Sequence, residues 1–341
     1  MDIEPSQISP YVQGVLGVSP VDDGVRLGRF TEAQMRHYAS FGEGRAIRSR
    51  CSSGASIALR TDAREAEISL KLLDRARDYA GVDVEVDGAI VHSIVAAPAG
   101  ETLRVPLFAF DGPAMRSVRV YLPQSVEFLI STLSVDDGAT LEPVSTGKTK
   151  ILCLGDSITQ GMNARHPASI YTTGLARSLD AEVLNQGVGG HVFDPASFDR
   201  RIPFEADIVT VAFGANDWKA NRLATELSEN VVAYLEAVRA RYPKARTIVI
   251  TPTWRVIANE RRACGTLTEF SRVIAEASTQ VDRVEVVDGL RLVPHRADLF
   301  PDGTHPNDEG FLYYSAGLCR HIRGDHPVSP ARDNDQGATT R

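Results

Sequence analysis

The sequence has few cysteines, and they are not arranged in pairs. Four occur in 341 residues, at positions 51, 153, 264 and 319, and no two of them have Cys-x-x-Cys spacing. We therefore expect neither a disulfide framework nor a cysteine-ligated zinc site. Cys153 lies within an apolar run, and we interpret it as a small buried hydrophobic residue.

Long apolar segments and runs of basic residues are also missing. No window approaches the roughly 18 apolar residues that a membrane helix needs, and the N-terminus lacks the features of a signal peptide. The formal net charge is −7, and no lysine or arginine cluster in the sequence suits a nucleic acid. We expect a soluble, cytoplasmic protein that binds neither membranes nor nucleic acids, and the charge is compatible with a neutral or cationic small substrate.

Alternating apolar and polar residues dominate the first 145 positions after an irregular opening. Residues 68–72 and 82–86 alternate with period two, which is typical of strands with one solvent-facing side. Asp87-Gly88 predicts a tight hairpin turn after the second of these runs. Together with further runs at 102–108, 117–122 and 126–135, the pattern predicts an antiparallel, jelly-roll-like β-sandwich domain over residues 1–145.

Two functions are open for this predicted sandwich. It either binds carbohydrate, or it packs against the rest of the chain, forms one wall of the active-site cleft and mediates homo-oligomerisation. Both tryptophans of the protein lie beyond residue 145, and sugar faces commonly stack on large aromatic rings. We therefore favour the packing role.

From residue 146 onward the pattern changes to short apolar runs that alternate with helical periodicity. Strands are predicted at 150–154, 182–185, 208–212, 247–251 and 284–287, and the clearest helices at 225–241 and 267–279. This order predicts a parallel sheet covered by helices on both faces, in a domain over residues 146–323. Residues 324–341 are polar, contain proline and glycine, and are predicted to form a disordered tail.

Polar and glycine-rich segments follow the predicted strands of the second half. Gly155-Asp156-Ser157 follows the first strand, a segment ending in Gly189-Gly190-His191 the second, and Gly214-Ala215-Asn216-Asp217 the third. A later segment, Asp302-Gly303-Thr304-His305, precedes a helix predicted to start near Phe311. Because the carboxyl ends of parallel strands meet at one sheet edge, we expect these segments to converge on one cleft.

These four segments, in this order, resemble the sequence blocks of the SGNH (GDSL-type) hydrolase and esterase superfamily. The resemblance spans residues 151–306 and implies a flavodoxin-like, three-layer α/β/α domain with a five-stranded parallel sheet. The preceding sandwich makes the chain similar to two-domain members of the superfamily, which include carbohydrate esterases. The resemblance further implies serine-dependent ester chemistry without a cofactor.

Ser157, His305 and Asp302 are the predicted catalytic residues. A neutral imidazole can remove the proton of a serine hydroxyl near pH 7, and an aspartate can orient the imidazole. Alone, Asp-x-x-His would more readily indicate a loop hydrogen bond, but the other three segments favour the catalytic interpretation. The resemblance implies that the oxyanion donors are the backbone amides of Ser157 and Gly190 and the side chain of Asn216.

Further candidates surround this predicted site. His191, Trp218 and Trp254 are interpreted as substrate contacts, with loop packing as the alternative for each tryptophan. His166, His191 and His295 are rival general bases, but no His-x-x-x-His or His-Glu-x-x-His spacing predicts a metal site.

The leading hypothesis is a cofactor-independent serine esterase that removes a short acyl group, most simply acetyl, from a sugar or another small hydroxylated compound. Two alternatives remain open: an acyltransferase that uses the same residues, and a catalytically silent binding protein on the same scaffold.

Overall fold

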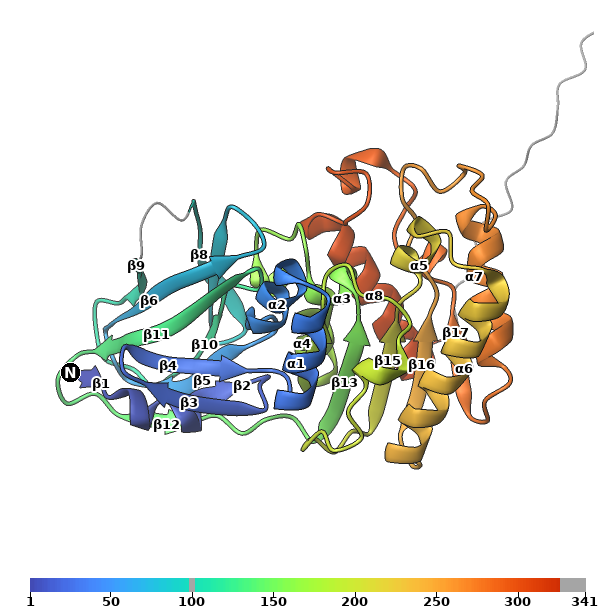
Figure 1. Cartoon of the computed structure of the whole chain (residues 1–341). Coiled ribbons are helices and arrows are strands. Elements are labelled where there is room, and N and C mark those ends of the chain that lie inside the picture. The colour runs from blue at the N-terminus through green and yellow to red at the C-terminus, as the bar shows by residue number, and fades with distance from the viewer. Residues whose placement is uncertain (98–101, 326–341) are drawn as a thin grey trace, which may run out of the picture.

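The computed structural model of the chain describes residues 1–97 and 102–325, and it places two antiparallel sheets beside a parallel one (Figure 1). The predicted tail from residue 324 lies almost wholly outside the described residues. None of the helices in the described ranges is both long and apolar enough to cross a membrane.

The N-terminal half is the predicted β-sandwich. Its first sheet has the order β3 (Gly17–Val21), β4 (Gly24–Gly28), β11 (Val126–Val135), β6 (Glu65–Arg75) and β9 (Thr102–Ala109), with β1 (Asp2–Ile3) also paired to β11. The second has the order β12 (Leu141–Pro143), β5 (Ser56–Thr61), β10 (Arg116–Tyr121), β7 (Ala80–Val86) and β8 (Ala89–Ala96), with β2 (Val12–Gln13) paired to β5.

The alternation in these strands has the expected structural consequence. Ile68 and Leu70 of β6 and Val82 and Val84 of β7 are fully buried in one core between the two sheets. The predicted turn joins β7 to β8, and both of its residues, Asp87 and Gly88, have positive φ values of 50° and 86°, as a type I′ turn requires.

The C-terminal half contains the predicted five-stranded parallel sheet. Its order is β14 (Ala181–Gly187), β13 (Thr149–Gly155), β15 (Ile208–Ala212), β16 (Arg246–Ile250) and β17 (Val284–Val287). The first strand of this half in the chain, β13, pairs with β14 on one side and β15 on the other. The strand order therefore reverses at β13, because the chain adds β14 on one side of it and β15 on the other. Ligand sites of such sheets lie at this reversal, outside the carboxyl ends of the strands.

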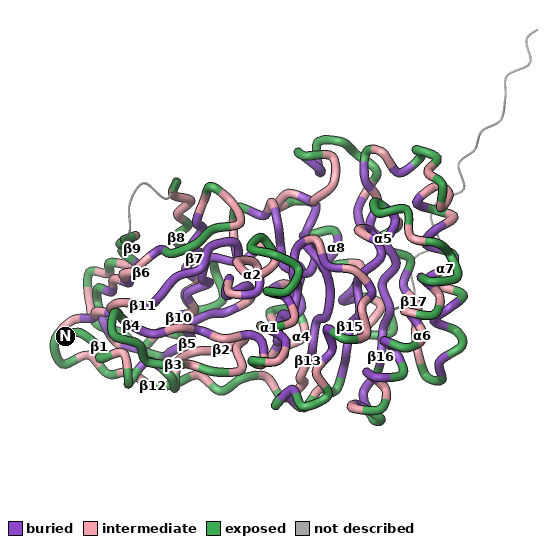
Figure 2. Tube along the Cα trace, viewed as in Figure 1, coloured by how far each residue is buried: buried purple, intermediate pink, exposed green. Residues whose placement is uncertain are grey.

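Helices cover both faces of this parallel sheet, which makes its strands the most buried part of the half (Figure 2). Helices α6 (Ala224–Arg241) and α7 (Leu267–Ser278) pack on one face. Helices α4 (Tyr171–Leu179) and α8 (Asp308–Arg323) pack on the other. The three-layer α/β/α prediction is confirmed.

Two helices interrupt the segment that the sequence left irregular. Helix α1 (Glu32–Ser40) begins with a capping box in which the Thr31 side chain accepts from the Gln34 amide, and α2 (Glu43–Arg50) follows directly. Both lie between the sandwich and β13 (Figure 1). The Gln34 side chain donates to the Ser197 carbonyl at 3.3 Å, so α1 is bonded to the segment that follows β14.

Candidate active site

Ser157 lies two residues after the end of strand β13, at the first position of the short helix α3 (Ser157–Gln160). Asp156 caps this helix, because its Oδ1 accepts from the Ile158 amide at 2.9 Å. The turn needs glycine at position 155, where a Cβ would lie 2.0 Å from Thr159 Oγ1 and 2.9 Å from the Ala212 carbonyl oxygen. The sharp turn therefore holds the serine at the carboxyl edge of the sheet.

Ser157, His305 and Asp302 form a continuous hydrogen-bonded chain. His305 Nε2 lies 2.8 Å from Ser157 Oγ, and His305 Nδ1 lies 2.6 Å from Asp302 Oδ2. The other carboxylate oxygen, Asp302 Oδ1, accepts from the amides of Thr304 and His305 at 3.0 and 2.8 Å. A base in contact with the hydroxyl, and a carboxylate in contact with the base, can together activate an oxygen nucleophile.

The electrostatic environment keeps Asp302 ionised. Partial burial acts to raise the pKa of this carboxyl, but hydrogen bonds from the His305 side chain and backbone outweigh burial and lower the pKa well below its ordinary value. A permanently charged Asp302 favours a proton on the adjacent ring nitrogen of His305. The opposite nitrogen, which faces Ser157, can then accept the serine proton.

Two backbone amides of the predicted site have no acceptor among the described residues. Within the described chain the amides of Ser157 and Gly190 donate no hydrogen bond, whereas the Gly189 amide donates to Gln160 Oε1 at 2.8 Å. Gly190 has a φ of +82°, a conformation that glycine adopts readily. These two amides can donate to a substrate oxygen.

Asn216 occupies the segment after β15 and is held by its amide nitrogen. Nδ2 donates to the His191 carbonyl oxygen at 2.8 Å and lies 3.4 Å from Asp156 Oδ2. The second contact is long and therefore weak. The Nδ2 hydrogen that faces Asp156 is therefore the one that Asn216 can donate to a bound substrate.

Two buried carboxyl groups support these segments. Burial raises the pKa of Asp156 to about 7, against the opposing effects of the Ile158 amide and Arg255. Burial also raises the pKa of Asp217 to about 6, although Arg222 and the Phe193 amide act in the opposite direction. Asp217 Oδ2 accepts from the Phe193 amide at 3.3 Å, so each carboxylate ties a loop of the site to the backbone.

The rival histidines do not contact Ser157. His166 Nδ1 lies 2.9 Å from Asp83 Oδ1, in the sandwich half. His295 Nε2 lies 2.7 Å from the Leu290 carbonyl oxygen. Only His305 reaches the serine hydroxyl among the histidines of the described residues.

Two of the three expected substrate contacts are corrected by the structure. Trp218 is 0% exposed and its Nε1 donates to the Gly265 carbonyl oxygen at 3.0 Å. His191 is also 0% exposed and is packed against the rings of Tyr38 and Phe41. Both side chains are therefore packed in the interior and are not available to a substrate in this structure.

Trp254 differs from these two residues because it is partly exposed. Its ring stacks on His295 with centroids 5.1 Å apart and meets the edge of Phe300. The next segment is bonded to the catalytic loop, since the Val256 amide donates to the Gly303 carbonyl oxygen at 3.0 Å. A substrate-contacting role for Trp254 stays a prediction.

One group of potential metal ligands occurs in the described residues, although sequence spacing predicted none. Ligand atoms of His37, His191 and Asp194 lie within 4.8 Å of one another. Asp194 is already hydrogen-bonded to His37 at 2.7 Å, and neither ring nitrogen of His191 has a partner. Burial is the main cause that lowers the pKa of His191, and the nearby charges of Arg45 and Arg222 add to this effect, so they oppose cation binding.

A cavity of about 640 Å³ lies away from the catalytic chain. It opens between the sandwich and the amino ends of the parallel strands, and its lining includes Gly14, Tyr121, Gly147, Thr173 and Ala181. Arg177 and the Tyr121 hydroxyl, both in its lining, contact Glu85. Because Ser157, His305 and Asp302 are not among its lining residues, the cavity is not the site of the Ser157 chemistry.

Sequence reasoning missed the contribution of helix α2 to the site. Arg48 Nη1 donates to the Gly189 carbonyl oxygen at 3.1 Å, and Arg45 Nη2 donates to that of Gly190 at 2.7 Å. The two arginines are three positions apart, which places them on one face of a helix. That spacing would have been a signal only if the helix itself had been predicted.

Comparisons with known proteins agree with this architecture. Residues 153–311 match the GDSL-like lipase/acylhydrolase family, whereas no curated protein matches the chain. The salicylyl-acyltransferase SsfX3 from a tetracycline biosynthetic pathway is 20% identical, with a TM-score of 0.81 over 95% of this chain and 97% of that one.

Carbohydrate esterases share the whole two-domain arrangement. A family two carbohydrate esterase from Cellvibrio japonicus is 16% identical, with a TM-score of 0.68 over 95% of this chain and 97% of that chain. The acetyl xylan esterase Est2A from the rumen bacterium Butyrivibrio proteoclasticus is also 16% identical, with a TM-score of 0.63 over 95% and 98%. At these identities the likeness concerns the fold.

Proposed function

Because residues 153–311 match the GDSL-like lipase/acylhydrolase family, we propose that the protein is a serine esterase. Its substrates are short acyl esters, most simply acetyl esters, of a sugar or another small hydroxylated compound. The observation that carries this proposal is the chain of hydrogen bonds from Ser157 through His305 to Asp302.

The reaction begins with proton transfer from Ser157 Oγ to His305 Nε2 while the oxygen attacks the ester carbonyl carbon. The resulting imidazolium ring keeps its Nδ1 proton and is stabilised by the ionised Asp302 carboxylate, 2.6 Å away. His305 then donates the transferred proton to the leaving alcohol. The products of this half-reaction are the free alcohol and an acyl ester of Ser157.

Negative charge develops on the carbonyl oxygen during the attack and requires fixed donors. The amides of Ser157 and Gly190 fit this task because they are unpaired within the described chain. Asn216 adds a side-chain donor when the substrate oxygen replaces its 3.4 Å contact with Asp156. In the second half-reaction, water activated by His305 releases the acid and regenerates Ser157.

The acyl group is proposed to be short on two grounds. The sequence contains no long apolar segment that could form a lipid-binding lid. One of the similar structures is that of an acetyl xylan esterase. A series of aryl esters of graded chain length tests this choice, with acetate expected to react fastest.

Acyl transfer to an alcohol or amine is the second candidate. It is favoured by the structural similarity to a salicylyl-acyltransferase, and it uses the same residues with an acceptor in place of water. Adding acceptor alcohols to the ester assay separates the two activities, because a transferase forms a new ester whereas an esterase forms only free acid. A silent binding protein, the third candidate, would hydrolyse no ester at all.

A chromogenic acetate ester tests the proposal directly. The wild-type protein is expected to hydrolyse it, and Ser157→Ala is expected to lose nearly all of that activity while its thermal unfolding midpoint is unchanged. Equal hydrolysis by both proteins would exclude Ser157 as the nucleophile.

A further inference from the structure

Three arginines from the sandwich half gather beside the Ser157 site. Arg45 and Arg48 lie on α2, and Arg77 lies in the connection between β6 and β7. Arg45 and Arg48 donate to the neighbouring carbonyl oxygens of Gly190 and Gly189, so their guanidinium groups lie on one segment. Burial lowers the pKa of Arg48, and the nearby charges of Arg77 and Arg45 lower it further.

The arginine cluster borders both loops that surround the nucleophile. Arg48 and Arg45 donate to the carbonyl oxygens of Gly189 and Gly190, in the segment that carries the candidate oxyanion amide. Arg77 Nε donates to Asn163 Oδ1 at 2.9 Å, in the segment directly after helix α3. The cluster therefore lies beside the place where the reacting part of a substrate would be held.

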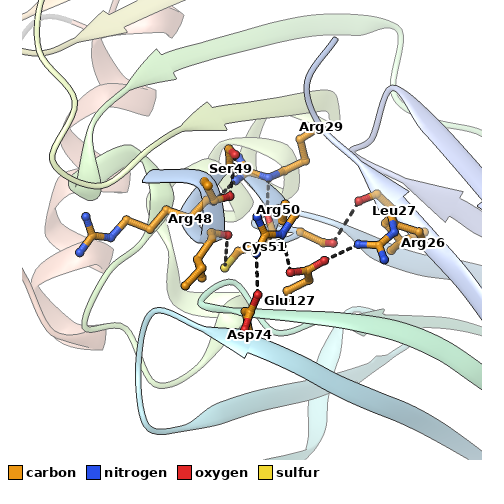
Figure 3. A network of polar contacts seen from close by, with 12 residues as sticks. Arg26, Leu27, Arg29, Arg48, Ser49, Arg50, Cys51, Asp74 and Glu127 are labelled. Atoms are coloured by element: carbon orange, nitrogen blue, oxygen red, sulfur yellow. Dashed lines mark hydrogen bonds and ion pairs between the residues drawn. The ribbon is translucent and has the colours of Figure 1, made fainter. Parts of the chain in front are cut away.

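Among the described residues, no carboxylate forms an ion pair with this cluster. Within residues 1–97 and 102–325, none of the three arginines forms an ion pair with an aspartate or glutamate, and the buried Nε atoms of Arg45 and Arg48 have no hydrogen-bond partner. Arg50, two positions after Arg48 on the same helix, has carboxylate partners. It contacts Glu127 and Asp74, while the guanidinium of Arg48 extends away from that network (Figure 3).

The Arg45 guanidinium lies over the Phe41 ring, 4.7 Å from its centroid, but a cluster of partly buried cations without a paired carboxylate is still costly in the free protein. Partly buried like charges repel one another more strongly than exposed ones, because solvent screens them less. The chain as a whole is acidic, with a formal net charge of −7, so the cluster does not reflect a generally basic surface. A bound anion would supply the missing counter-charge and accept the unused guanidinium donors.

We propose that Arg45, Arg48 and Arg77 form a subsite for an anionic group, a carboxylate or a phosphate, on the ester that Ser157 attacks. The inference rests on the proposed esterase function and narrows its substrate class to esters of anionic compounds. The net charge of the chain is compatible with a neutral or cationic substrate, but it does not select one. Local charge at the site outweighs the net charge of the chain, since charges more than about 10 Å away are screened by salt.

Matched esters that differ in one charge test the subsite. The probes are 4-acetoxybenzoate, its neutral methyl ester and 4-acetoxyphenyl phosphate, each corrected for spontaneous hydrolysis. The wild-type kcat/KM is expected to favour an anionic ester over the methyl ester by about tenfold or more, as one charged hydrogen-bonded contact provides. The two anionic probes distinguish carboxylate from phosphate.

Arg77→Gln is the central variant because Arg77 contacts neither glycine of the candidate oxyanion segment. This substitution is expected to lower the preference for the anionic ester about tenfold. A higher salt concentration should also lower the preference of the wild-type protein, because salt screens the arginine charges. Arg36→Gln is the matched control. Arg36 is exposed on α1 and paired with Glu32, so removing its charge should leave the preference unchanged.

Failure of the subsite and failure of the esterase proposal give different results. Ser157-dependent hydrolysis with equal kcat/KM for charged and neutral esters, in wild type and Arg77→Gln alike, would overturn the subsite alone. If no ester is hydrolysed, calorimetric titration with 4-hydroxybenzoate and its methyl ester still tests it. The subsite is supported if wild type binds 4-hydroxybenzoate more tightly than the methyl ester and Arg77→Gln loses this difference. Equal affinities of wild type for the two ligands contradict it.

Discussion

Asp302 accepts hydrogen bonds from both the ring and the backbone of His305. Its Oδ2 lies 2.6 Å from Nδ1 and its Oδ1 lies 2.8 Å from the backbone nitrogen. These two contacts within a four-residue segment fix the position of the ring, and they leave Nε2 directed at Ser157, 2.8 Å away. The proposed chemistry depends on this orientation, and the first prediction tests it.

Asp302→Asn should lower kcat for acetate hydrolysis by roughly 10⁴-fold. The amide keeps the size of the carboxylate, but it cannot stabilise the imidazolium ring with a negative charge. Asp298→Asn is the control, because Asp298 is an exposed residue paired with Arg296 in the preceding segment. Comparable loss of activity in both variants would mean that loop disruption, and not the orienting contact, is responsible.

Asn216→Ala should lower kcat by roughly 10²–10³-fold and change KM little, because an oxyanion donor acts mainly in the transition state. Nδ2 also holds the His191 carbonyl oxygen, so thermal unfolding must be measured in parallel. A variant that unfolds like wild type and retains full kcat would remove Asn216 from the proposed site.

Gly155→Ala should destabilise the protein by roughly 1–3 kcal/mol or more, because the added methyl group overpacks a closed turn. A Cβ at this position would lie 2.0 Å from Thr159 Oγ1. Gly17→Ala is the matched control, since a Cβ there meets no atom within 4 Å. Denaturant unfolding of the two variants gives the comparison, and equal stabilities would contradict the described turn.

The buried His191 should make stability fall as the pH falls below about 6.5. Burial lowers the pKa of this ring from 6.5 to about 3, so between these values the unfolded chain binds a proton that the folded protein does not. The unfolding free energy attributable to His191 should therefore decrease by about 2 kcal/mol from pH 7 to pH 5.

His191→Phe isolates this contribution. Asp156 and Asp217 have raised pKa values and change stability in the opposite direction, but they are present in both proteins and cancel in the difference. The wild-type unfolding free energy, relative to that of His191→Phe, should decrease between pH 7 and pH 5. A difference that does not vary with pH would show that His191 is not held neutral by burial.

The regular elements were predictable from the sequence wherever a periodic apolar pattern was long enough. Period-two alternation identified β6 and β7, and helical periodicity identified α6 and α7 within a few residues. Helix α2 was missed because its eight residues include one large apolar side chain, Ile47. A helix this short and polar is stabilised by its tertiary contacts, which no local pattern records.

The candidate site was predictable to the extent that strand ends determine it. Ser157 and Asn216 follow neighbouring strands of one parallel sheet, so the sequence order alone indicated a shared edge. The arginine cluster could not be found in this way, because Arg48 and Gly189 are 141 positions apart and meet only through packing of the two halves. The burial of Trp218 likewise depends on side-chain direction, which strand order does not determine.

The central claim is that Ser157 carries the acyl group during turnover. Mass spectrometry of the protein after treatment with a fluorophosphonate measures the reactivity of that hydroxyl directly. We predict a single covalent adduct on the peptide that contains Ser157, absent in Ser157→Ala and strongly slowed in His305→Ala. Wild-type protein that hydrolyses acetate esters while Ser157 remains unmodified would contradict the proposed mechanism.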